Sequence, residues 1–125
     1  MIGRFSEEHD AIVNALGDLR RTAGDGADPS ARVAALRGLL DPHTEAEERS
    51  LFAPLRRDPE FADVVDALCA EHTAINAALD AVEQDQPGAV AALEHLLMRH
   101  IDKEENGLFP AAIMAGIDWD AVTAS

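Results

Sequence analysis

The sequence predicts an all-α protein: an antiparallel up-down-up-down four-helix bundle with a short C-terminal segment. Four long stretches place apolar residues at three- and four-residue steps, which is the spacing of one helix face. The connections between these stretches are short, so neighbouring helices should run antiparallel. The composition agrees, because the chain has no Tyr, one Trp and four Phe, and no β-rich run alternates with a period of two. Its 125 residues suit a single domain over residues 1–125.

The first helix is expected over about residues 6–23. Ser6 is its expected N-cap, and the acidic residues that follow suit the positive end of the helix dipole. His9 lies on or beside the apolar stripe that continues through Ile12 and Leu16. The Gly-Asp-Gly sequence of residues 24–26 should end the helix.

The second helix should start with Asp28 as N-cap and Pro29 as its first residue. Its apolar face continues into His43 and Glu47, and Pro42 is expected to kink or interrupt it. The apolar residues of this face are Val33, Leu36, Leu39, Leu40, Leu51 and Phe52.

The third helix is expected over about residues 60–82 and carries His72 on its apolar stripe. The fourth should begin near residue 87 or 89 and carries His100 and Glu104 on the same kind of stripe.

The C-terminal segment follows Asn106 and Gly107, which should end or weaken the fourth helix. Residues 108–115 are expected to form a further short helical turn. Trp119 is expected to pack the tail onto the bundle.

One pattern occurs twice. Residues 43–52 and 100–109 both read H-x-x-x-E-E-x-x-L-F, and a Pro follows each copy. Each copy puts an imidazole and a carboxylate on one helix face, one turn apart. A second repeat relates residues 8–16 to residues 71–79. The chain therefore reads as two helical hairpins related by an approximate two-fold axis.

The two repeats together supply six polar groups on or next to the predicted apolar stripes. Burying six such groups without partners would be costly, so a metal centre is favoured over a satisfied core. Four imidazoles and two carboxylates divide evenly over two metal ions, with each carboxylate bridging. Iron, manganese and zinc all accept such ligands, although zinc usually takes four of its own. The candidate ligands are His9, His43, Glu47, His72, His100 and Glu104.

The motif H…HxxxE…H…HxxxE resembles that of hemerythrin-like (HHE cation-binding) domains, over about residues 5–115. The resemblance implies a cofactor of two iron ions with a bridging oxo or hydroxo group. It implies that one iron is bound by His9 and His43 and the other by His72 and His100. By the same resemblance, Glu47 and Glu104 bridge the two irons.

The chain departs from the oxygen-carrying members at Asn76, where the resemblance places a third His on one iron. A more symmetric centre favours redox chemistry on a small molecule (H2O2, O2 or NO) over oxygen transport. We therefore expect an oxidoreductase that is catalase- or peroxidase-like. The alternative is a non-enzymatic module that binds or senses O2, NO or iron.

Several groups near the ligands need separate interpretation. Glutamates next to them in sequence, Glu8, Glu48, Glu71 and Glu105, are expected on a solvated face, with hydrogen bonding to the ligands as the alternative. Glu105 is the group most able to replace Glu104. Cys69 is expected to be a small buried residue rather than a ligand, and His95 a surface residue. Aromatic packing around the site is expected from Phe5, Phe52 and Phe109.

The net charge of −14 argues against binding to nucleic acid or to an anionic membrane surface. No run has the length of a membrane-spanning helix, and the first residues contain no apolar signal core. The single cysteine, Cys69, allows no intramolecular disulfide. These features predict a cytoplasmic protein.

Overall fold

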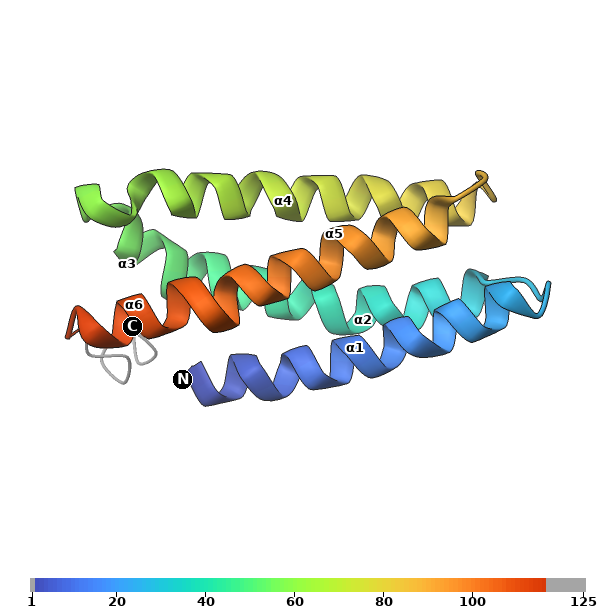
Figure 1. Cartoon of the computed structure of the whole chain (residues 1–125), viewed down its shortest axis with the longest axis horizontal. Helices are drawn as coiled ribbons and strands as arrows, with labels where there is room; N and C mark the ends of the chain where they lie inside the picture. Colours follow the sequence, from blue (N-terminus) through green and yellow to red (C-terminus); the bar gives the residue numbers. More distant parts are fainter. Residues whose placement is uncertain (1, 117–125) are drawn as a thin grey trace.

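The protein folds as an antiparallel four-helix bundle, as predicted (Figure 1). The computed structural model describes residues 2–116, and within that range it contains helices and turns but no strand. Successive long helices run in opposite directions, and α1 packs on α2 while α4 packs on α5 (Figure 1). No helix in the described range is long and apolar enough to cross a membrane. The four long helices are α1 (Ile2–Gly24), α2 (Ser30–Glu47), α4 (Pro59–Glu83) and α5 (Ala89–Lys103).

A wider, π-helical turn follows each copy of the H-x-x-x-E motif: η1 (Glu48–Phe52) and η2 (Glu104–Leu108). A short α-helix continues each of them, α3 (Ala53–Arg56) and α6 (Phe109–Met114), with Pro54 or Pro110 at its start. Proline has no N–H to give to the carbonyl four residues earlier, and its ring crowds that carbonyl. The wider turn relieves this conflict, and it precedes the proline in both copies of the motif.

The core consists of two apolar clusters, one on either side of a layer of polar residues. The first apolar cluster fills the end of the bundle that carries the α1–α2 and α4–α5 turns. It includes Ile12, Leu36, Leu79, Leu93 and Leu97. The second apolar cluster fills the other end and includes Phe5, Phe52, Leu55, Val65 and Phe109. On α1, α2 and α4, a histidine lies between the helix's contributions to the two clusters, while His100 lies near the end of α5, before Leu108 and Phe109 of the second cluster.

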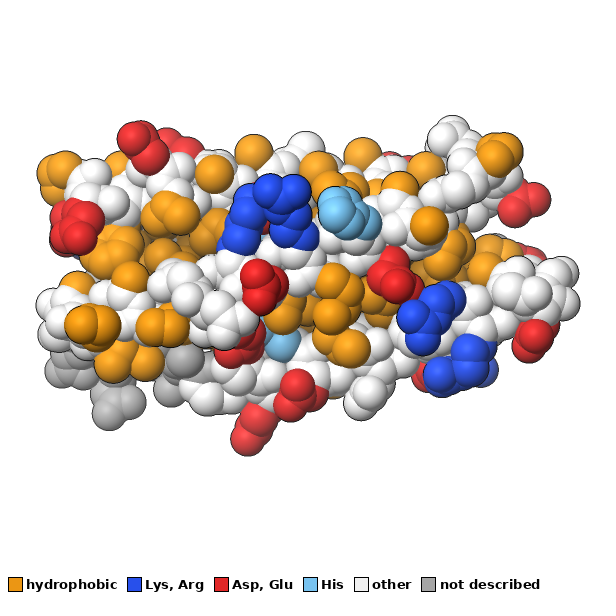
Figure 2. All heavy atoms as spheres, in the orientation of Figure 1, with side chains coloured by type: hydrophobic (Ala, Val, Ile, Leu, Met, Phe, Trp, Pro, Cys, Tyr) orange, Lys and Arg blue, Asp and Glu red, His pale blue; other side chains and the backbone are white. Residues whose placement is uncertain are grey.

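Ion pairs connect the helices at the surface. Arg37 of α2 reaches Asp80 and Glu83 of α4 at 2.6 and 3.1 Å, and Arg20 of α1 reaches Glu94 of α5 at 3.3 Å. Figure 2 shows acidic and basic side chains distributed over one face, with apolar side chains visible between them. These exposed pairs contribute little stability each, so the buried clusters hold the bundle together.

Three predictions about the elements need correction or stay open. The first helix begins at Ile2, so Ser6 lies within it and is not its N-cap. Pro42 does not interrupt α2, which runs unbroken from Ser30 to Glu47. Trp119 lies outside the described residues.

Candidate metal centre

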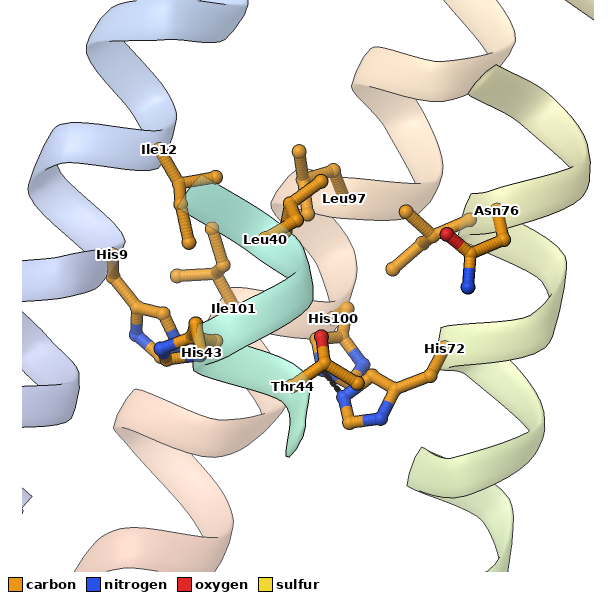
Figure 3. A pocket seen from close by; sticks show the side chains of 11 residues that line it. His9, Ile12, Leu40, His43, Thr44, His72, Asn76, Leu97, His100 and Ile101 are labelled. Carbon is orange, nitrogen blue, oxygen red and sulfur yellow. Dashed lines mark hydrogen bonds between the residues drawn. The ribbon is translucent and has the colours of Figure 1, made fainter. Parts of the chain in front are cut away.

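Six polar side chains form one buried layer across the bundle, between the two apolar clusters. The histidines are each at most 6% exposed, and both glutamates are fully buried. Each long helix supplies one imidazole, and the four rings converge on the bundle axis (Figure 3). The members of this polar layer are His9, His43, Glu47, His72, His100 and Glu104, the same six residues that the sequence singled out.

The carboxylate of Glu47 lies between the two halves of the polar layer. Its Oε2 is 3.4 Å from Nε2 of His43, on its own helix. Its Oε1 is 3.1 Å from Nε2 of His72, on α4. One oxygen therefore faces each half, which is the arrangement that a bridging carboxylate needs.

Glu104 also touches both halves. Its Oε1 lies 3.3 Å from Nε2 of His9 and 3.0 Å from Nε2 of His100. These contacts link α1 to the start of η2, and so connect the first hairpin with the second.

The ligand atoms fall into two overlapping groups, each within 4.8 Å. One group holds His9, His43, Glu47 and Glu104, and the other holds Glu47, His72 and His100. Within the described residues, Nε2 of His9, Oε2 of Glu47 and both carboxylate oxygens of Glu104 are buried without a hydrogen-bond partner. Unpaired polar atoms are costly at such depth, and a cation placed among them would satisfy them together. The donor set of imidazole nitrogen and carboxylate oxygen fits iron, manganese or zinc.

The two buried carboxylates have opposite pKa shifts. Burial, followed by the hydrogen bond with Glu104, raises the pKa of Glu47. Burial also acts to raise the pKa of Glu104, but the neighbouring Glu47, His100 and His9 outweigh it and lower that pKa. The shifts of opposite sign favour the neutral form of Glu47 and the charged form of Glu104.

Three of the imidazoles have raised pKa values. Burial opposes protonation, but the surrounding carboxylates outweigh it and raise the pKa of His9, His43 and His72. Metal binding must displace these protons, because only a neutral imidazole nitrogen can act as a ligand.

The four glutamates next to the ligands are half-buried, except for the exposed Glu48, and the structure shows the alternative expected for them, hydrogen bonding to the ligands. Each accepts a hydrogen bond from Nδ1 of a histidine on another helix. The pairs are Glu8 with His43 (2.8 Å), Glu48 with His72 (3.1 Å), Glu71 with His100 (2.8 Å) and Glu105 with His9 (2.6 Å). We call these four residues the outer glutamates.

The outer glutamates form a closed circuit around the bundle. A carboxylate of α1 accepts from a histidine of α2, and one of η1 accepts from α4. A carboxylate of α4 accepts from α5, and one of η2 accepts from α1. An acceptor at Nδ1 fixes the tautomer of each imidazole, so that Nε2 presents its lone pair to the bundle axis. Further groups hold three of these carboxylates: Arg4 pairs with Glu8 at 3.2 Å, Lys103 pairs with Glu71, and Ser6 donates to Glu105 at 2.9 Å.

Glu105 therefore faces His9 rather than the centre, and it belongs to neither group of potential ligands. Cys69 is half-buried, lies 3.2 Å from a guanidinium nitrogen of Arg56, and is likewise in neither group. His95 is exposed on α5, as expected.

Three phenylalanines close the polar layer on the side of the second apolar cluster, in agreement with the sequence. Phe52 stacks on His72 with ring centroids 5.6 Å apart, and Phe109 stacks on His9 at 5.9 Å. Phe5 meets His43 edge-on at 5.5 Å. All three are buried, so water has no direct path to the histidines from this end.

On the opposite side, the four histidines border a small cavity whose walls are mostly apolar (Figure 3). The volume open to the centre of a water molecule is about 10 Å³. This is room for about one water-sized ligand. Besides the histidines, its lining consists of Ile12, Leu40, Thr44, Ile75, Asn76, Leu97 and Ile101. Sequence reasoning did not identify Thr44, because nothing in the spacing marks a residue beside a ligand as facing a cavity.

The family model described as the hemerythrin HHE cation binding domain matches residues 1–112. The match covers every residue of the polar layer, the outer glutamates and the cavity. No curated protein and no solved structure matches the chain.

Proposed function

The chain belongs to the hemerythrin HHE cation-binding family, and from this premise we propose that its polar layer holds two iron ions and acts on hydrogen peroxide. His9 and His43 bind one iron, His72 and His100 bind the other, and an oxo or hydroxo group joins the two metals. Glu47 and Glu104 bridge them. The protein is then a di-iron oxidoreductase that is catalase- or peroxidase-like.

The position of Glu47 carries this proposal. Its two oxygens approach imidazoles on α2 and α4, at 3.4 and 3.1 Å. One carboxylate here spans two sets of nitrogen donors, which favours two metal ions over a single one. Mixed nitrogen and oxygen ligation of this kind is compatible with iron.

A pair of iron ions would supply the two electrons that reduce one peroxide to water, and would recover two electrons when a second peroxide is oxidised to O2. The chain itself provides a water-poor setting, because Phe5, Phe52 and Phe109 close one side of the polar layer. Glu47 provides a place for a proton, since burial raises its pKa. Asn76 stands where the resemblance to oxygen carriers places a further histidine, and the loss of that imidazole favours turnover over oxygen transport.

One observation favours a second function, the binding or sensing of O2 or NO without turnover. The cavity beside the histidines is walled largely by Ile and Leu side chains, and apolar walls suit apolar diatomic gases. For either function we propose a cytoplasmic location, because a chain with one cysteine suits a reducing compartment.

Metal analysis, absorption spectra and addition of H2O2 test the proposal together. We expect about two irons per chain, oxo-to-iron charge-transfer bands, and evolution of oxygen on adding peroxide. The His72→Ala variant should lose iron and activity, whereas His95→Ala, which changes an exposed histidine on α5, should keep both. One zinc per chain would contradict the di-iron centre, and reversible O2 binding without peroxide turnover would favour the second function.

A further inference from the structure

The cavity beside the polar layer has buried walls and one polar edge. Its apolar lining residues, Ile12, Leu40, Ile75, Leu97 and Ile101, are all buried. The histidines on its floor are buried as well. Only two lining residues are not buried: Thr44 is half-buried and Asn76 is exposed.

These two residues mark where the cavity reaches the surface. Thr44 lies on α2 and Asn76 on α4, and the two helices are neighbours in the bundle. Both side chains border the same cavity (Figure 3). Since the phenylalanines close the other side of the polar layer, the edge between Thr44 and Asn76 is the least buried approach to the histidines.

The two side chains also differ chemically from the rest of the lining. A hydroxyl can donate and accept a hydrogen bond, and a carboxamide provides two donors and an acceptor. No Lys, Arg, Asp or Glu lines the cavity, so the mouth offers hydrogen bonds but no charge. A small neutral molecule with its own donors and acceptors fits this combination better than an apolar gas does.

We propose that Thr44 and Asn76 are specificity-determining residues, which form the polar mouth of the cavity and favour hydrogen peroxide over O2 and NO. This inference rests on the proposed function and names the feature that selects its substrate. The hydroxyl of Thr44 and the amide of Asn76 hydrogen-bond to peroxide as it enters, while O2 and NO gain little from either group. Both residues position the ligand, and neither binds the metal.

Near-isosteric substitutions test the mouth in the iron-loaded protein. Thr44→Val and Asn76→Leu remove the polar atoms and keep the approximate volume. Each should raise KM for peroxide about three- to tenfold, the effect of one lost hydrogen bond, with little change in kcat. Thr44→Ser, which keeps the hydroxyl, should restore the KM of the unaltered protein.

The matched controls are Thr73→Val on the exposed surface of α4 and Asn14→Leu on the exposed surface of α1. They make the same chemical changes away from the cavity and should leave KM unaltered. Metal content and melting temperature, measured for every variant, separate a change at the mouth from partial unfolding.

Equilibrium binding of two probe ligands, followed by absorption, gives a readout that does not depend on turnover. Azide accepts hydrogen bonds and NO hardly does, so Thr44→Val and Asn76→Leu should weaken azide binding several-fold and leave NO affinity unchanged. A protein without peroxide turnover would refute the proposed function. The ratio of azide affinity to NO affinity would then still test whether Thr44 and Asn76 select ligands by hydrogen bonding. Equal effects of the mouth variants on both probes, or none on either, would overturn the inference.

Discussion

Nδ1 of His43 lies 2.8 Å from Oε1 of Glu8, although the two residues are on different helices. Glu8 immediately precedes His9 in the chain, so one turn of α1 supplies both a potential ligand and the acceptor that orients another. The same relationship recurs around the bundle for Glu48, Glu71 and Glu105. Helix packing and ligand orientation therefore depend on the same hydrogen bonds.

The first prediction concerns this pair. Glu8→Gln keeps the shape of the side chain but removes the charge that favours an Nδ1–H on His43. We expect metal affinity to fall about 10- to 100-fold, the usual effect of losing such a partner. Competition with a chromogenic chelator measures it. Glu7→Gln, at the exposed neighbouring position, is the control, and equal affinities for the two variants would show that the contact does not orient the ligand.

The second prediction separates metal binding from folding at Glu47. Burial raises the pKa of this residue and so favours its neutral form in the metal-free protein, and Gln is a close mimic of that form. We expect metal-free Glu47→Gln to melt within about 2 °C of the unaltered protein, a change of under about 0.5 kcal/mol. Metal binding should be largely lost. Exposed Glu45→Gln on the same helix should retain two metals, and a Glu47→Gln protein that also retained them would contradict the bridging role.

The sequence predicts the polar layer well and the outer glutamates badly, for one physical reason. His43 and Glu47 are four residues apart, so they share a helix face whatever lies around the helix. Glu48 points about 100° away from Glu47, a direction that can meet either water or a neighbouring helix. In this bundle it meets His72 of α4. Which case holds depends on the order and spacing of the helices, which no local pattern contains.

The π-helical turns show a second limit. The repeated proline is visible in the sequence, and a kink is the ordinary expectation at any proline inside a helix. Pro42 leaves α2 uninterrupted, whereas Pro54 and Pro110 each follow a wider turn. Exposure to water does not account for the difference, because Gly38, four residues before Pro42, and Asn106, four residues before Pro110, are both exposed.

The third prediction is a pH dependence of the metal-free protein. Carboxylates outweigh burial and raise the pKa of His9, His43 and His72 above the usual value of about 6.5. Groups with raised folded pKa values stabilise the fold fully below the unfolded pKa and lose that contribution as pH rises through the folded pKa. The free energy of unfolding should therefore fall between pH 6 and pH 9.

Burial also raises the pKa of Glu47, so this carboxyl gives a contribution of the same sign. The pKa of Glu8 is lowered, because its partners His43 and Arg4 outweigh burial. The contribution of Glu8 to the free energy of unfolding is lost only in acid and stays constant between pH 6 and pH 9. Denaturant titrations of chelator-treated protein at pH 6, 7.5 and 9 measure the trend. Metal affinity should rise over the same range, because fewer protons must be displaced, and a metal-free protein more stable at pH 9 than at pH 6 would refute the assignment.

The fourth prediction distinguishes packing on a ligand from packing alone. Phe52 and Phe61 both belong to the second apolar cluster and are both buried, but only Phe52 stacks on His72. Substitution of either by Leu should lower the free energy of unfolding by about 1 kcal/mol, since both swaps roughly conserve volume. Phe52→Leu should in addition speed metal loss to a chelator, because water then gains access to the imidazole. Phe61→Leu should release metal at the rate of the unaltered protein, and equal release from both variants would mean that the phenylalanine side of the polar layer does not protect it.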